Sequence, residues 1–283
     1  VTGTIISGSY ATSSAGRGVN IKTFSHGMFQ SVYDYPYLSS SANHIFDVTW
    51  GYVSSSKINT VLEGSEIIGN VTLQDNKKRN IYSQMAQILS GYDISGSVRE
   101  FDFDGNHGDG GDKLGAAAFI TLSRLLVKDE IKKGSFSLTM GTADAYATPF
   151  TSVQTFADVK ATGSYKINSP AGEYGLLYTG SSNSPGLPRG LIFYQAGVVV
   201  LPITSALVGG DRSSVQWVSA SSGTTNKLQV LRTGSIDAFA DGFLRRIPKV
   251  QFNNTTELNS TIFFCRANNT EFNYSSNPTY LSG

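Results

Sequence analysis

The chain has 283 residues, of which 40% are apolar and 15% charged, and its formal net charge is +1. A chain of this length can bury a substantial core, and its apolar content is far above that of disordered chains. The basic residues form short scattered groups instead of a basic face, so nucleic acid is not an expected partner. The single cysteine, Cys265, excludes an intrachain disulfide framework, and no apolar run approaches the roughly 20 residues of a membrane span.

The N-terminal residues 1–25 are rich in Gly, Ser and Thr and show little periodicity. This composition predicts an extended N-terminal arm or an edge strand. Arms of this kind often lie across a neighbouring subunit, and a frayed terminus is the alternative. Residues 26–156 then predict a β-rich half with one helix. Its first clear strand is expected at residues 45–52, where side chains alternate between two faces.

A helix is predicted at about residues 76–90, capped by Asp75 or Asn76 and stopped by Gly91. Its apolar stripe is formed by Ile81, Met85, Ile88 and Leu89. The first turn, residues 77–79, is basic and therefore opposes the helix dipole. That turn is expected to be exposed to solvent, or else to be retained for a contact.

The second half of the chain predicts turns, hairpins and one more helix. Residues 157–190 contain several Pro and Gly turns and are expected to form a turn-rich connection. A second helix is predicted at about residues 235–246, with one apolar face and Pro248 beyond its end. Two hairpins are expected, pairing 191–194 with 198–203 and 250–252 with 261–266.

The expected fold class is therefore α+β, with mostly antiparallel sheet and two principal helices. Residues 191–283, including an aromatic C-terminal segment, form a second unit or one continuous domain with residues 26–156.

The sequence EFDFDGNHGDGG, which begins at Glu100, resembles a calcium-binding loop in its spacing of oxygen ligands. Asp102, Asp104 and Asn106 occupy positions 1, 3 and 5 of an EF-hand loop. Position 6, which needs Gly, is His107, and position 12, which needs a bidentate Glu, is Lys113. We therefore expect a hairpin between strands at about 97–103 and 116–127, in which Asp and Gly supply turn geometry. A lone irregular calcium site is the alternative.

Catalytic and cofactor motifs are absent from the sequence. The three histidines lack partners at zinc-binding spacing, and neither a nucleophile elbow, a phosphate-binding loop nor a dinucleotide fingerprint occurs. Paired carboxylates of the glycosidase type could meet in the fold, but no local pattern marks them. We expect no enzyme activity, no cofactor and no small-molecule substrate.

The C-terminal segment alternates aromatic and polar residues before an Asn-Pro turn. Such a segment packs on its own domain or is donated to the sheet edge of a neighbour. The interaction candidates are Phe272, Asn273, Tyr274, Asn277 and Pro278.

Several stretches of the chain are distinctive. They are FFCRANNTEFNYSSNPTY at 263–280, SSANHIFDVT at 40–49, NIYSQMAQ at 80–87, GYD at 91–93, and residues 128–136. These stretches resemble virion structural proteins of tailed bacteriophages, in particular marine and T-even-like contractile-tailed phages.

The resemblance implies a structural subunit of the tail or baseplate, assembled in the host bacterial cytoplasm with copies of itself and other virion proteins. A head or neck component, such as a decoration or connector protein, is one alternative. A carbohydrate-binding or glycan-degrading tail protein is the other.

Overall fold

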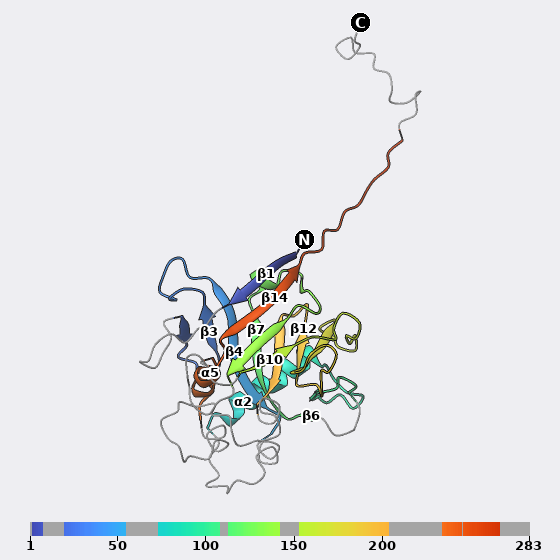
Figure 1. Ribbon diagram of the computed structural model, residues 1–283. Coiled ribbons are helices and arrows are strands. Elements are labelled where there is room, and N and C mark those ends of the chain that lie inside the picture. The colour runs from blue at the N-terminus through green and yellow to red at the C-terminus, as the bar shows by residue number, and fades with distance from the viewer. Residues whose placement is uncertain are drawn as a thin grey trace.

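This computed structural model describes residues 2–7, 20–54, 73–107, 113–141, 153–203, 234–244 and 246–266. Within these ranges the chain forms two large antiparallel sheets, a two-stranded ribbon and three helices, which confirms the predicted α+β class. Figure 1 shows the strands and helices gathered in one body, from which the C-terminal segment extends. No helix in the described ranges is long and apolar enough to cross a membrane.

The smaller of the two sheets, called sheet A below, contains five strands among the described residues. In spatial order they are β1 (Thr2–Ser7), β14 (Lys249–Thr255), β9 (Ser137–Gly141) and β10 (Val153–Ala157), with β8 (Glu130–Ile131) pairing the end of β14. The N-terminal residues thus supply an edge strand, one of the two outcomes expected for them. Thr2 of that strand lies opposite Thr255.

The larger sheet, sheet B, contains seven strands among the described residues. They are β11 (Tyr174–Leu177), β12 (Gly190–Phe193), β13 (Val198–Pro202), β7 (Ala116–Leu122), β4 (His44–Tyr52), β3 (Gln30–Tyr33) and β2 (Ile21–Thr23). The strands β12 and β13 are buried at every position, which requires cover on both faces of the sheet.

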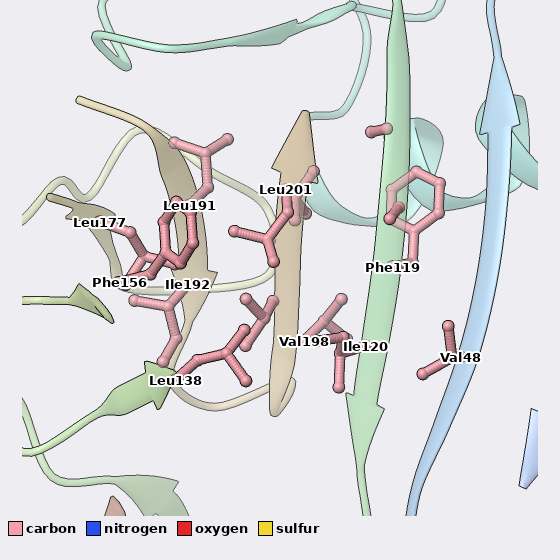
Figure 2. Packing of buried hydrophobic residues seen from close by; sticks show 14 of the residues in the cluster. Val48, Phe119, Ile120, Leu138, Phe156, Leu177, Leu191, Ile192, Val198 and Leu201 are labelled. Carbon is pink, nitrogen blue, oxygen red and sulfur yellow. The ribbon is translucent and has the colours of Figure 1, made fainter. Parts of the chain in front are cut away.

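Sheet A and the helix α5 (Ile236–Leu244) cover one face of sheet B, and the helix α2 (Asp75–Leu89) covers the other. Phe239 of α5 contacts the ring of Trp50, whereas Tyr82 of α2 contacts the ring of Phe119. Phe119 pairs with Thr49, the residue next to Trp50. Successive strand residues point to opposite faces, so Phe119 and Trp50 lie on opposite faces of sheet B. Figure 2 shows Leu138 and Phe156 of sheet A in the same buried cluster as Ile192 of sheet B.

The first predicted helix is confirmed, with a different cap and a different buried face. Gln74, not Asp75 or Asn76, is the N-cap, and Gly91 follows the helix with the predicted positive φ of 77°. Ile88 is 63% exposed, and Lys78 of the basic first turn is fully buried. Lys78 Nζ lies 4.6 Å from the centre of the Trp50 ring and donates to the Gly234 carbonyl at 2.8 Å, so this residue is retained for a contact.

The helix α2 crosses β4 at Gly51, where the two backbones are in close contact. A Cβ placed on Gly51 would lie 2.8 Å from the Tyr82 amide nitrogen of α2. Glycine is needed there because a side chain has no space against main-chain atoms that cannot move independently. The close approach of α2 to β4 at this point therefore requires glycine.

Two predicted strands are longer than the strands in the structure. Only Phe101–Asp102 (β5) of the expected strand 97–103 is a strand, and it pairs with Lys113–Leu114 (β6), so a hairpin exists but joins shorter strands than predicted. The expected strand 116–127 ends at Leu122, and a one-turn helix, α3 (Arg124–Val127), follows.

The last predicted hairpin is wrong, because β14 pairs with β1, β8 and β9, and residues 261–266 pair with no described strand. The second predicted helix is confirmed as α5.

Candidate functional site

The loop that contains Asp102, Asp104 and Asn106, predicted as a hairpin connection with a calcium site as the alternative, packs against a neighbouring segment. Asp102 is 1% exposed and accepts a hydrogen bond from the Lys113 ammonium at 2.7 Å, across the base of the β5–β6 pair. The Gly105 carbonyl accepts bonds from the Asn168 amide at 3.0 Å and from the Tyr174 hydroxyl at 3.1 Å. Asp102 and Gly105 of the loop are therefore anchored by hydrogen bonds to other segments, while Asn106 is exposed.

The three candidate calcium ligands are occupied by other partners. Asp104 accepts from the Asn106 backbone at 3.0 Å and from its side-chain amide, and Asp102 is paired with Lys113. An ammonium group therefore already balances the buried carboxylate that a calcium ion would need as a ligand. In the part of the chain that the structure describes, no group of three or more His, Cys, Asp or Glu residues could hold a metal ion.

The C-terminal arm, defined here as residues 256–266, extends from β14 away from the body (Figure 1). Every residue from 257 to 266 is exposed. Large apolar side chains occur along it, with exposures of 78% for Leu258, 73% for Ile262, 82% for Phe263 and 94% for Phe264. A single exposed Leu is ordinary, but four large apolar side chains within seven residues of an extended segment make the arm a candidate contact surface.

The root of the arm is fixed to the body by β14 and by the turn after α3. The Asn254 side-chain amide donates to the Leu126 carbonyl at 2.7 Å, and the Glu257 backbone N–H donates to Asp129 at 2.8 Å. Thr255 also forms a bridge with Lys128. The arm therefore leaves the protein at a defined point and in the direction of β14.

A buried carboxylate joins sheet A to sheet B behind the edge strand β10. Asp158, the residue after β10, is 1% exposed and accepts from the Tyr194 hydroxyl at 3.1 Å and from the backbone N–H groups of Gly134 at 2.7 Å and Phe136 at 3.0 Å. Burial raises the pKa of Asp158, and the three donors act in the opposite direction. No local sequence pattern marks this residue, because its donors are 22 to 36 positions away along the chain.

A group of aromatic residues occupies the connection between β3 and β4. Tyr35 and Tyr37 are 58% and 38% exposed, and the Tyr37 ring lies 6.5 Å from that of Tyr33. The connection is stabilised at its base by Asp34, whose carboxylate accepts from the Asn43 backbone at 2.6 Å and from its side chain at 2.9 Å. Exposed tyrosines on a braced loop are a second candidate contact surface.

The predicted interaction residues Phe272, Asn273, Tyr274, Asn277 and Pro278 lie outside the described residues. The described arm leads directly into that segment. Sequence reasoning placed residues 261–266 in a hairpin and so did not identify them as a contact surface. The run of apolar residues Ile262–Phe264, which lacks charge and precedes another aromatic segment, is the signal that could have indicated one.

Comparisons with known proteins give no relative: no protein family, no curated protein and no solved structure matches the chain.

Proposed function

We propose that this chain is a non-enzymatic structural subunit of a tailed-phage virion, located in the tail or baseplate. The observation that carries the proposal is the C-terminal arm, which holds four large apolar side chains in solvent on an extended segment. An isolated chain gains nothing from such a segment, whereas a subunit buries it against a neighbour during assembly.

Two further features support an assembly role. The stretches that resemble phage virion proteins include residues 263–266 of the arm and residues 44–49 of β4. Charged residues make up only 15% of the chain, and a surface of low charge allows copies to approach one another closely without strong repulsion.

The decisive experiment is a density map of the intact phage particle in which this chain is located and its copies are counted. A ring of about six or twelve copies in the tail is the expected result, because tail components obey cyclic symmetry. Many copies on the shell would instead assign the chain to the head as a decoration protein. Absence from the purified particle, verified by mass spectrometry, would overturn the proposal.

The exposed tyrosines of the β3–β4 connection favour a second candidate function, carbohydrate binding by a tail protein. Aromatic side chains with free faces are suited to stacking on apolar surfaces of ligands. Binding of host surface polysaccharide by the full chain, lost in Tyr35→Ala and Tyr37→Ala and kept in Phe263→Ser, would support this function. Equal binding by all four proteins would contradict it.

A further inference from the structure

Within the described residues, part of the outer edge of β10 has no backbone hydrogen-bond partner. Ala157 at the end of this strand exchanges both backbone hydrogen bonds with Tyr178, at 2.9 and 2.8 Å, so Ala157 faces away from β9. In an antiparallel strand the residues that face a given side alternate, so Thr155 and Val153 face the same way as Ala157. Within the described residues, neither Thr155 nor Val153 has a backbone partner on that side.

Among the residues that the structure describes, this edge lacks the features that normally prevent strands from pairing. The sequence of β10, VQTFA, contains neither charge nor proline, and Val153 is 55% exposed. Sheet B is different: its edge strand β2 carries Lys22, and a two-bond bridge between Tyr174 and Lys166 covers the start of β11. Because unprotected edges pair with other strands, proteins retain them where a partner strand is supplied.

The C-terminal arm contains a segment that fits this edge. Residues 261–265, TIFFC, are uncharged, extended and rich in residues that favour strands. They number five, as do the residues of β10. Residues 256–260 precede them and serve as the connection from the body. An extended peptide that adds to a sheet edge gains main-chain hydrogen bonds, and its alternate side chains pack on the face of the sheet.

The arm of the same molecule leaves at the wrong end of sheet A to reach this edge. β10 runs parallel to β14, because both are antiparallel to β9, and the pairing places Thr155 level with Lys249. Val153 therefore lies eight positions back from Thr255, which is about 26 Å at the usual rise per strand residue. The arm continues away from that point (Figure 1), so the arm of the same molecule does not lie on this edge.

We propose that residues 261–265 of one copy add as a strand to the β10 edge of a second copy, at Val153 and Thr155. The contact is head to tail, because the arm leaves one end of sheet A and the free part of β10 lies at the other. Head-to-tail contacts of identical subunits close into rings or continue as filaments. This inference deepens the proposed structural function and rests on it for the symmetric assembly in which the contact is made.

The native cysteine makes a direct test simple. Cys265 is exposed at the end of the proposed strand, so Thr155→Cys places a second thiol on the edge that receives it. Treatment of the full-length variant with a short bismaleimide is expected to give a ladder of covalent oligomers on a denaturing gel. The double variant Thr155→Cys with Cys265→Ser, and the variant Thr23→Cys at the edge of sheet B, are the matched controls and should give no ladder.

A ladder from Thr23→Cys equal to that from Thr155→Cys would overturn the proposal. A ladder from Thr4→Cys, on the opposite edge strand β1, together with no ladder from Thr155→Cys would also overturn it. Absence of any ladder at concentrations where the wild type self-associates would also overturn it.

A charge on the edge provides an independent measurement. Val153 is exposed, so Val153→Lys should fold normally, as checked by circular dichroism, and weaken self-association by about tenfold in sedimentation velocity. Phe263→Ser on the arm should have an effect of the same size, and Lys22→Ala at the edge of sheet B should have none. Unchanged self-association in both Val153→Lys and Phe263→Ser would contradict the proposal.

The two proposals fail in different ways. If the chain is found as a ring in the particle but the ladder is absent, the structural function stands and the arm contact is wrong. If the ladder forms but the chain is absent from the particle, self-assembly through the arm stands and the virion function is wrong.

Discussion

Replacement of Asp158 by Ala should remove a substantial part of the stability of the protein, because this one side chain accepts hydrogen bonds from three donors in two segments. The Phe136 backbone N–H and the Tyr194 hydroxyl are both buried and would be left without an acceptor, at about 1.5 kcal/mol each. Gly134 is exposed, so its N–H can bond to water instead, and its loss is about 1 kcal/mol. Asp158→Ala is therefore expected to cost about 4 kcal/mol.

Equilibrium unfolding in urea measures this cost, with the fluorescence of the buried Trp50 as the signal. Tyr194→Phe, which removes one donor and keeps the ring, should cost about 1 kcal/mol. Asp158→Asn keeps one acceptor oxygen and should lie between the two. A loss below about 1 kcal/mol for Asp158→Ala, at an unchanged slope against urea, would refute the view that Asp158 joins the two sheets.

Three further predictions concern other parts of the fold. Gly51→Ala should lower stability by about 3 kcal/mol in urea unfolding, since its Cβ would contact the main chain of α2. The hydrogen bond of His44 to Asp47 is 2.8 Å long and raises the pKa of His44 above 6.5. Its contribution to stability is therefore complete below about pH 6.5 and is lost as the pH rises through the folded-state pKa. His44→Gln should remove this dependence, so that the melting temperature changes less between about pH 6 and 8. Lys113→Met should cost about 3 kcal/mol, because it leaves the buried carboxylate of Asp102 unpaired, and calcium at about 1 mM should not change the wild-type melting temperature.

Each of these predictions has a control in the same chain. Gly163 has open space around its Cβ position, so Gly163→Ala should be nearly neutral. Asp47→Asn should flatten the pH profile as His44→Gln does. Lys249 is exposed on β14, so Lys249→Met should have little effect. Losses in Gly163→Ala or Lys249→Met equal to those in their test variants would contradict the explanations given for Gly51 and Lys113. A wild-type pH profile in Asp47→Asn would contradict the explanation given for His44, and a rise in melting temperature with calcium would restore the metal site.

The elements that could be predicted from the sequence are those whose signal is local. Helix α2 is marked by apolar spacing and by Gly91, and α5 is marked by an apolar face and Pro248. Strand β4 is marked by its alternation. In each case residues close together in the sequence determine the element, so its pattern can be recognised without knowing how the rest of the chain folds.

The parts that could not be predicted depend on residues far apart in the chain. Lys78 is buried because Trp50 and the Gly234 carbonyl meet it, although its position in a basic first turn is typical of a solvent-exposed residue. The pairing of β14 with β1 joins the two ends of the described chain, and no periodicity in either segment specifies it. The pattern of residues 261–266 favours a strand, but a pattern does not say whether the partner strand belongs to the same molecule.

The junction between β14 and the arm also determines how the protein responds to mechanical load. The arm continues in the direction of β14, and that strand is paired with β1 along six residues and with β9 along three (Figure 1). A pull on the arm is therefore directed along β14 and loads those backbone hydrogen bonds together in shear, instead of opening them one after another. The same hydrogen bonds that complete sheet A would make the root of the arm a firm anchor when neighbouring molecules are drawn apart.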